Sequence, residues 1–202
     1  MAGVGILILA AGSSSRLGRP KQLLEYQGKT LLRRAAETAV ASNFTPVAVV
    51  TGAQHDALLP ELAGLPVAAV HNPHWAEGMG TSLKTGLAAL EALPDAAALT
   101  GVIVLLCDQP LVTPALLRQL VETHQATDYA IVAAEYNGVR GVPVFFGAAA
   151  LPLLRALPNT GGAQQLLRQH PEWVASVPFA GGAVDVDTEA QYAALLAGRF
   201  GN

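Results

Sequence analysis

This chain of 202 residues has little of several features that would place it in common protein classes. Its single cysteine, Cys107, excludes an internal disulfide bond and fits a reducing compartment. Aromatic residues make up 5% of the chain and are not interleaved with Lys and Arg, which argues against a stacking surface for single-stranded nucleic acid. Charged residues make up only 13%, so the composition is not that of a disordered protein.

Long hydrophobic runs are also missing. The first apolar run, Val4–Leu9, is far shorter than the roughly 20 residues that a membrane-spanning helix needs. No basic segment and no A-x-A cleavage site mark a secretory signal, so we expect a soluble, cytoplasmic protein without a membrane partner. Hydrophobic residues make up 51% of the chain, enough for a large core, and we predict one domain over residues 1–202.

A cationic loop follows that first apolar run. Small and hydroxyl-bearing residues leave its backbone N–H groups accessible to a ligand, and Arg16, Arg19 and Lys21 supply positive charges for a polyphosphate. Ligands of open α/β sheets bind at the carboxyl ends of strands, so we predict a nucleotide site here; the alternative is an ordinary connection with solvated charges. The predicted contacts in this loop are Leu9, Ala10, Ala11, Gly12, Ser13, Arg16 and Lys21.

Positive charge is concentrated near the start of the chain. Six of the 12 Lys and Arg residues lie in the first 34 positions, where Glu25 is the one acidic residue. The formal net charge of the whole chain is -3, so we expect no binding to nucleic acid. A local positive region on a mildly acidic protein favours a small phosphorylated ligand.

The loop does not match two familiar phosphate-binding motifs. The Walker A pattern fails because the second glycine, Gly18, is followed by Arg19-Pro20 instead of Lys and a hydroxyl residue. The dinucleotide pattern G-x-G-x-x-G is absent, so a dehydrogenase is the weakest alternative. The pattern that fits is L-x-A-G-x-x-x-R-x-G-x-x-K, formed by Leu9, Ala11, Gly12, Arg16, Gly18 and Lys21. It resembles the signature of nucleotidyltransferases that attach a nucleoside monophosphate to a phosphorylated acceptor.

Acidic residues close two later extended segments. Asp108 follows the apolar run 102–106, and because Thr113 already caps the next helix, we predict Asp108 as a ligand of Mg²⁺, which prefers carboxylate and phosphate oxygens. Alternation places Asp185 and Asp187 on one face of their segment, so one of them can supply a second metal ligand. For this pair, a solvated strand end next to a helix start is an equally good interpretation.

A second loop with glycines lies between a predicted strand and helix at residues 71–82. Gly78 and Gly80 allow close backbone approach, and hydroxyl groups follow, so we predict that this loop contacts the nucleobase. The predicted contacts are Asn72, Gly80, Thr81 and Ser82. The five histidines are scattered and no cysteine pairs with them, which argues against a zinc site.

Strand and helix patterns alternate along the chain. Extended segments are predicted at residues 4–9, 46–50, 67–70, 102–106, 129–133, 142–146, 173–177 and 183–186. Helices are predicted at residues 30–42 and 54–62, from 81 or 82 through 93, from 114, from 160 to 169 and from 189. The predicted caps include Thr30 and Thr160, and residues 188–191 match a capping box that begins at Thr188. This alternation indicates a doubly wound, mostly parallel, Rossmann-like α/β sheet, and the turn at Tyr136-Asn137-Gly138 predicts a hairpin with an antiparallel edge.

Together these segments resemble the molybdenum cofactor nucleotidyltransferases, the cytidylyltransferase type most closely. The matching segments are residues 4–24, 72–82, 107–110, 141–144, 161–163 and 184–188. The resemblance implies a nucleotidyltransferase fold, Mg²⁺, CTP or else GTP as substrate, a phosphorylated pterin as acceptor and a molybdoenzyme as client. The segment Gly141-Val142-Pro143 departs from the family pattern, because many members have a histidine where this chain has Val142. This departure affects the identity of the acceptor more than the nucleotide chemistry.

The resemblance also implies a mechanism. The terminal phosphate of molybdopterin attacks the α-phosphorus of the triphosphate and pyrophosphate leaves, with Arg16, Lys21 and Asp108 as the catalytic residues. A phosphate nucleophile is ionised near neutral pH, so positioning and charge neutralisation suffice without a general base. The alternatives are a guanylyltransferase, a sugar-phosphate nucleotidyltransferase and a non-catalytic chaperone that binds the cofactor.

Overall fold

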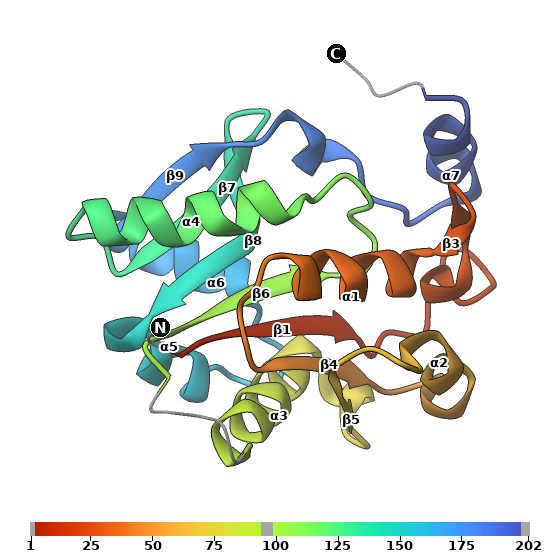
Figure 1. Ribbon diagram of the computed structural model, residues 1–202, viewed down its shortest axis with the longest axis horizontal. Helices are drawn as coiled ribbons and strands as arrows, with labels where there is room; N and C mark the ends of the chain where they lie inside the picture. The colour runs from red at the N-terminus through yellow and green to blue at the C-terminus, as the bar shows by residue number, and fades with distance from the viewer. Residues whose placement is uncertain (1–2, 94–98, 199–202) are drawn as a thin grey trace.

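The computed structural model describes residues 3–93 and 99–198 and confirms the alternation of strands and helices there. A seven-stranded sheet with the order β5-β4-β1-β6-β8-β7-β9 forms the centre of the molecule (Figure 1). Its strands are β1 (Val4–Ala10), β4 (Val47–Thr51), β5 (Ala68–His71), β6 (Gly101–Leu106), β7 (Ile131–Tyr136), β8 (Val139–Gly147) and β9 (Val174–Pro178). A small separate hairpin joins β2 (Glu25–Tyr26) to β3 (Lys29–Thr30).

The sheet is mostly parallel, as predicted, but its antiparallel strand does not lie at an edge. β8 runs antiparallel to both β6 and β7, whereas β1 is parallel to its neighbours β4 and β6, and β9 is parallel to β7. The predicted hairpin turn is present, with Asn137 at φ 51° and Gly138 at φ 71°. Because this turn returns β8 between β6 and β7, and β9 then pairs outside β7, the antiparallel strand lies inside the sheet.

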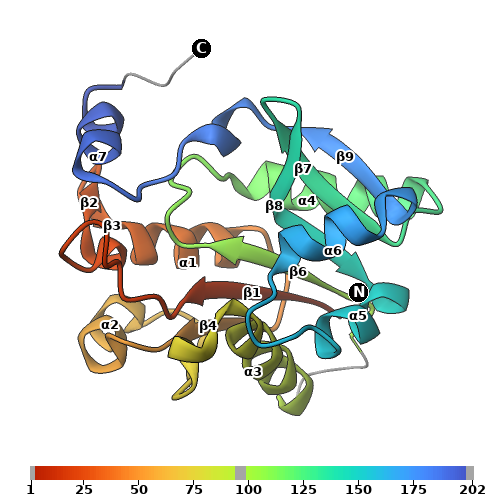
Figure 2. The ribbon, with the colours of Figure 1, turned by 180° about the vertical axis from the view of Figure 1, so that it is seen from behind.

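Helices cover both faces of the sheet (Figures 1 and 2). The face seen in Figure 1 carries α1 (Leu31–Ala41) and α4 (Pro114–Ala126). The face seen in Figure 2 carries α3 (Met79–Ala92), α5 (Leu151–Arg155) and α6 (Ala163–Gln169). Within the described part of the chain, none of the helices has the length and apolar character that crossing a bilayer requires.

Two hydrophobic cores follow from the alternation of side chains along β1. Leu7 belongs to the core that contains Leu83 of α3, whereas Ile6 belongs to the core that contains Leu32 of α1 and Leu117 of α4. Successive strand side chains point to opposite faces, so a strand covered on both sides must be apolar throughout. This requirement explains the uninterrupted first run of the sequence.

Among the segments that differ from the predictions, two helix starts and one extended segment concern the site. α3 begins at Met79, before Thr81. The Thr81 hydroxyl lies within hydrogen-bond distance of the carbonyl oxygens of Gly78 and His74, so its proton goes to a carbonyl and the hydroxyl does not cap the helix. α6 begins at Ala163, so Thr160 does not cap it. The predicted extended segment 183–186 is wrong in part, because residues 180–183 form a 3₁₀ turn that the hydrogen bond from the Gly182 N–H to the Phe179 carbonyl closes.

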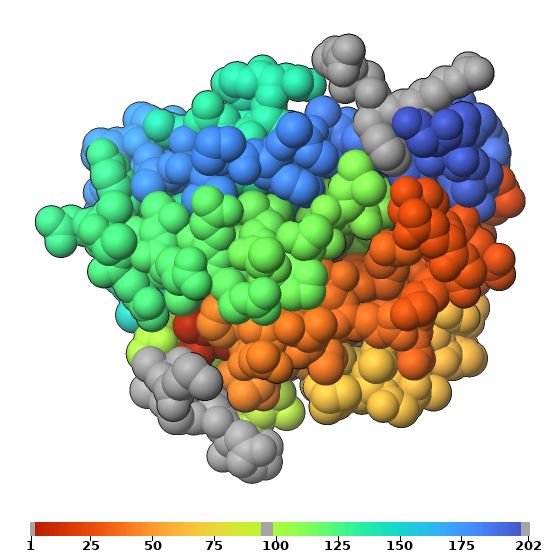
Figure 3. Space-filling view, turned by 45° about the horizontal axis from the view of Figure 1, so that its top comes forward, coloured from red at the N-terminus to blue at the C-terminus, as the bar shows by residue number. Residues whose placement is uncertain are grey.

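A third apolar cluster joins the two ends of the chain. It contains Leu17, Leu24 and Leu31 from the N-terminal part, and Val186 and Leu195 from the C-terminal part. The blue C-terminal part accordingly lies beside the orange N-terminal part at one end of the molecule (Figure 3). The last helix is α7 (Glu189–Leu196), and its predicted cap is confirmed by the hydrogen bond from the N–H of its third residue, Gln191, to the Thr188 hydroxyl. This packing brings the segment before α7 to the cationic loop.

The order of the strands also sets the place of the site. The chain passes from β1 through α1 to β4, then through α2 (His55–Leu62) to β5, and returns to add β6 on the other side of β1. The direction of strand addition therefore reverses between β1 and β6. In open α/β sheets, ligands bind outside the carboxyl ends of the strands at such a reversal.

Candidate active site

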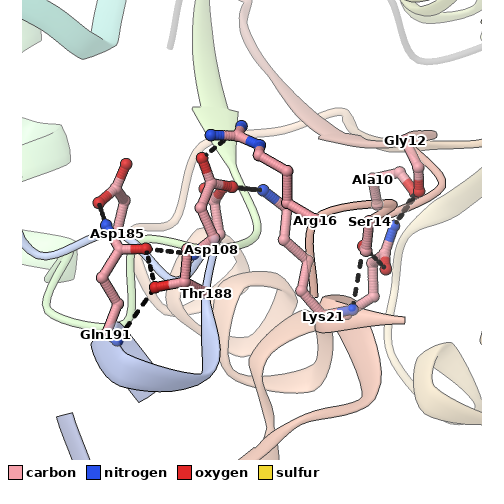
Figure 4. A network of polar contacts seen from close by, with 11 residues as sticks. Ala10, Gly12, Ser14, Arg16, Lys21, Asp108, Asp185, Thr188 and Gln191 are labelled. Carbon is pink, nitrogen blue, oxygen red and sulfur yellow. Dashed lines mark hydrogen bonds and ion pairs between the residues drawn. The ribbon is translucent and has the colours of Figure 1, made fainter. Parts of the chain in front are cut away.

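A buried amide, Gln22, holds the loop after β1 in shape. Its Nε2 donates to the carbonyl oxygens of Ala10 at 2.9 Å and Gly12 at 2.8 Å, and its Oε1 accepts from the hydroxyl of Ser14 at 3.2 Å. The same hydroxyl accepts from the backbone N–H of Lys21 at 3.0 Å. The loop carbonyls are thus bound by the amide, and the backbone of Lys21 is fixed against the loop (Figure 4).

Lys21 connects the loop to acidic residues from two distant segments. Its Nζ donates to Asp108, just after β6, and to Oδ1 of Asp187, before α7, at 2.7 Å. The guanidinium of Arg16 forms an ion pair with Oδ2 of Asp187 at 2.6 Å. Figure 4 shows Lys21 and Arg16 directed toward this acidic cluster, to which Asp185 also belongs. The structure therefore brings together all the predicted catalytic and metal-binding side chains.

Charge pairing sets the protonation states in this cluster. Burial opposes the charge of Lys21, but the carboxylates of Asp108 and Asp187 outweigh burial and raise the Lys21 pKa above its ordinary value. Burial likewise opposes ionisation of Asp187, but hydrogen bonds and charge from Lys21 and Arg16 lower its pKa. Burial, together with the charges of Asp108 and Asp187, raises the pKa of Asp185. The ionised form is therefore less favoured for Asp185 than for Asp187.

These side chains line a cavity of about 380 Å³ at the carboxyl ends of β1 and β6. The other lining residues that sequence analysis predicted as nucleotide contacts are Leu9, Ala10, Ala11, Gly12 and Ser82. Ser13 is exposed and lies outside this lining. Trp75 and Met79 also line the cavity and were not predicted, although both lie in the loop 71–82 that the sequence singled out. They add large apolar side chains to the lining of the charged cavity.

The remaining predicted nucleobase contacts hold this loop against its surroundings. Asn72 is fully buried, and its Nδ2 donates to the hydroxyls of Thr81 at 2.8 Å and Ser82 at 2.9 Å. A Cβ on Gly80 would lie 2.1 Å from the carbonyl oxygen of Pro158, so the space above Gly80 is filled by the protein. The close approach at Gly80 is thus made by the protein itself, and the role of these residues toward a nucleobase stays a prediction.

A second cavity of about 310 Å³ adjoins the first. The two share Leu9, Met79 and Leu106. Val142, the departure from the family motif, lines the second cavity. Its other lining residues are Val104, Thr160, Gly162, Ala163, Gln164, Gln165 and Arg168. The site therefore consists of a charged cavity beside a mainly apolar one that carries amides and one cation.

Asp108 has the features of a cation ligand. Its side chain is 8% exposed, and its Oδ1 has no hydrogen-bond partner among the described residues. A buried carboxylate oxygen without a partner is costly unless a cation compensates it. Among the described residues, no group of three His, Cys, Asp or Glu side chains could hold a metal on its own. The donor set suits a hard divalent cation whose remaining ligands are phosphate oxygens and water.

Gln191 is a further residue that sequence analysis missed. Its Nε2 donates to Oδ1 of Asp185 at 2.9 Å, and its Oε1 accepts from the backbone N–H of Asp187 at 3.0 Å and from the hydroxyl of Thr188 at 3.0 Å. The capping pattern at 188–191 predicted a helix start. It did not predict that the Gln191 side chain also holds Asp185 and Asp187 in place. Cys107 is buried, and burial raises the pKa of its thiol to about 12, so the thiol stays protonated near neutral pH and is a poor nucleophile.

The sequence is similar to a known family and to proteins of known activity. Residues 6–174 match the family described as the MobA-like NTP transferase domain. The nicotine blue oxidoreductase of Paenarthrobacter nicotinovorans is 34% identical, over 94% of this chain and 95% of the relative. The molybdenum cofactor cytidylyltransferase of Escherichia coli strain K12 is 26% identical, over 93% of each chain.

Solved structures with a similar fold cover nearly the whole chain. The crystal structure of Rv0371c from Mycobacterium tuberculosis H37Rv is 29% identical, with a TM-score of 0.82, and covers 97% of this chain and 98% of that chain. A complex of Rv0371c with manganese has a TM-score of 0.77, at 29% identity, and covers 97% of this chain and 99% of that chain. A divalent metal is therefore known in a protein of very similar fold.

Proposed function

This chain belongs to the MobA-like NTP transferase family and is a nucleotidyltransferase, and from that premise we propose that it transfers CMP from CTP to the terminal phosphate of molybdopterin. The observation that carries the proposal is the convergence of Arg16, Lys21 and Asp108 in one cavity at the carboxyl ends of β1 and β6. The cytidylyltransferase relative supports the choice of nucleotide and acceptor.

In the proposed reaction, an oxygen of the acceptor phosphate forms a bond to the α-phosphorus, and the bond from the α-phosphorus to the bridging oxygen breaks as pyrophosphate leaves. Arg16 would hold the β- and γ-phosphates, and Lys21 would neutralise charge at the α-phosphate and the leaving group. The acceptor phosphate is already ionised near neutral pH. The protein therefore contributes position and positive charge, and no side chain has to remove a proton.

The acidic cluster would hold magnesium. Asp108 and either Asp185 or Asp187 are its proposed ligands, on the strength of the unpartnered Oδ1 of Asp108 and the raised pKa of Asp185. When bound, the ion supplies positive charge next to the phosphate oxygens. An added cation would compensate both the buried oxygen and the repulsion among the three acids.

The second cavity is the proposed site of the acceptor ring. Met79, Leu106 and Val142 offer apolar contact to a flat heterocycle, and the neighbouring amide side chains offer hydrogen bonds. Arg168 supplies a cation at the same cavity. A phosphorylated pterin combines these three properties, and its phosphate could reach the first cavity because the two cavities adjoin.

The test is release of pyrophosphate from radiolabelled CTP, GTP, ATP and UTP in turn, with magnesium and molybdopterin. We expect CTP to give the highest rate and Lys21→Ala to lower it about 100-fold or more, as loss of one preorganised charge typically does. Lys29→Ala is the matched control, because Lys29 pairs with Glu37 and lies outside the cavity lining. Full transfer by Lys21→Ala would contradict the role assigned to Lys21. A higher rate with GTP would identify GTP as the nucleotide, and a higher rate with a sugar 1-phosphate would identify that compound as the acceptor.

A second candidate function comes from the 34% identical relative that is an oxidoreductase. The charged cavity could equally receive the pyrophosphate of a nicotinamide dinucleotide beside a heterocycle in the second cavity. Consumption of NADH or NADPH with a heterocyclic substrate, and no release of pyrophosphate from any triphosphate, would select this function. Tight molybdopterin binding with neither reaction would select the chaperone.

A further inference from the structure

We propose that Lys21 is an internal counter-ion of the acidic cluster, so that the site takes a divalent cation and a triphosphate together and binds either one alone weakly. The inference rests on the proposed function, because it concerns how that site receives its metal and nucleotide. It concerns the exchange of partners by Lys21, which contacts both Asp108 and Asp187 in the structure.

Each side of the site already neutralises the other. Lys21 binds both Asp108 and Asp187, and Arg16 binds Asp187. The cations that are suited to phosphates are thus paired with the carboxylates that are suited to a metal. With Asp185 included, three carboxylates face two cations, which leaves one negative charge for an incoming cation to meet.

A metal ion arriving alone has to compete with Lys21. The Lys21 side chain is only 19% exposed, so removing its carboxylate partners leaves a poorly hydrated ammonium without an anion. A triphosphate arriving alone has the opposite problem. It would draw Lys21 away from Asp108, whose side chain is 8% exposed, and leave that carboxylate unpaired beside two other acids.

The two ligands together remove both penalties. The metal pairs with the carboxylates, the phosphates pair with Lys21 and Arg16, and every buried charge keeps a partner of opposite sign. The free energy of binding is therefore coupled between the two ligands, and by linkage each raises the affinity of the other by the same factor. The unpartnered Oδ1 of Asp108 marks an independent place where a cation can begin to bind.

The test measures Mn²⁺ binding by calorimetry, with and without a non-hydrolysable CTP analogue and without any acceptor. In the wild type we expect the analogue to tighten Mn²⁺ binding about 10-fold or more, within the usual range of such couplings. Lys21→Met should bind Mn²⁺ alone about 10-fold more tightly than the wild type, and the effect of the analogue should shrink toward none. Lys21→Arg keeps the positive charge and should restore weak binding of Mn²⁺ alone.

Lys29→Ala is the matched control for net charge. Lys29 pairs with Glu37 and lies outside the cavity lining, so its loss should leave Mn²⁺ binding within about twofold of wild type. Thermal unfolding of each variant verifies that it is folded. The inference is overturned if Mn²⁺ binds the wild type equally with and without the analogue, or if Lys21→Met binds Mn²⁺ alone no more tightly.

These outcomes are separate from those of the transfer assay. Pyrophosphate release by the wild type together with uncoupled Mn²⁺ binding would leave the transferase function standing and reject the counter-ion role. Coupled Mn²⁺ and nucleotide binding without pyrophosphate release to any acceptor would support the counter-ion role and remove the proposed reaction.

Discussion

Asp185 differs from the other two acids of the site in its immediate surroundings. Asp108 and Asp187 contact Lys21, whereas Asp185 accepts a hydrogen bond from the amide of Gln191. Burial and the neighbouring carboxylates raise the pKa of Asp185, so its ionised form costs stability at neutral pH. A carboxylate has to be ionised to bind a metal ion. Functional sites commonly keep charges that lower the stability of the fold, because those charges are needed for binding or catalysis.

Asp185→Asn should therefore stabilise the protein in the absence of metal. The amide removes the repulsive charge and can still accept the hydrogen bond from Gln191. We expect the midpoint of thermal unfolding in EDTA at about pH 7 to rise on the order of 2 °C. The same variant should bind Mn²⁺ with the CTP analogue more weakly, because it has lost one possible ligand.

The pH dependence of this gain follows from the direction of the shift. The folded-state pKa of Asp185 lies above the ordinary value of 3.8, so ionisation opposes folding fully above that raised pKa and not at all below 3.8. The advantage of Asp185→Asn should shrink as the pH falls toward 3.8. Thermal unfolding of both proteins across this range tests it; equal midpoints near neutral pH, or an advantage that persists in acid, would argue against the assigned environment.

At the scale of elements, the two loops that line the first cavity use glycine differently. A Cβ on Gly12 would meet no atom within 4 Å, whereas a Cβ on Gly80 would lie 2.1 Å from the Pro158 carbonyl oxygen. Gly12→Ala should therefore leave the unfolding midpoint unchanged, but weaken binding of the CTP analogue about 10-fold if the phosphates approach the backbone there.

Gly80→Ala is the contrasting variant. Its new methyl group collides with backbone that cannot move freely, so we expect a loss of about 1–3 kcal/mol in the free energy of unfolding. Denaturant titration and calorimetric binding of the analogue, measured on both variants, separate packing from ligand contact. Unchanged nucleotide affinity in Gly12→Ala would remove the opening loop from the phosphate site, and unchanged stability in Gly80→Ala would reject the packing described for α3.

Elements with a strong local pattern were predictable from the sequence. β1 and β6 are apolar throughout because both of their faces are buried, and α1 and α4 begin at the predicted caps Thr30 and Thr113. The internal place of β8 was not predictable, because it depends on pairing with β6, which lies far away in the sequence. The antiparallel hairpin itself was predictable from its turn.

The same division holds within the site. Arg16, Lys21 and Asp108 were predicted because a charge at the end of an apolar strand is conspicuous. Gln22 and Gln191 were missed because an uncharged amide has no distinctive pattern in sequence, and its importance comes from the backbone groups that the fold places around it. Asp185 and Asp187 line the same cavity, although their segment does not form the extended strand that was expected.

At the scale of the whole molecule, the site depends on packing between the two ends of the chain. The apolar cluster that contains Leu17 and Leu195 holds α7 against the N-terminal loop, and this contact carries Asp187 to Lys21. β6 brings Asp108 to the same point from the middle of the sheet. We therefore propose that segments from the start, middle and end of the chain act on one metal-bound triphosphate.

Electron–nuclear double resonance of Mn²⁺ with the phosphorus nuclei of a bound, non-hydrolysable CTP analogue tests whether one ion joins these segments to the phosphates. The wild type should show a coupling between the metal and phosphorus if, as we propose, Asp108 and the phosphates hold the same ion. Asp108→Asn should lose Mn²⁺ and this coupling, and the control Glu37→Gln, whose acid pairs with Lys29 outside the cavity, should keep both. Undiminished coupling in Asp108→Asn, or bound Mn²⁺ without phosphorus coupling in the wild type, would contradict the account.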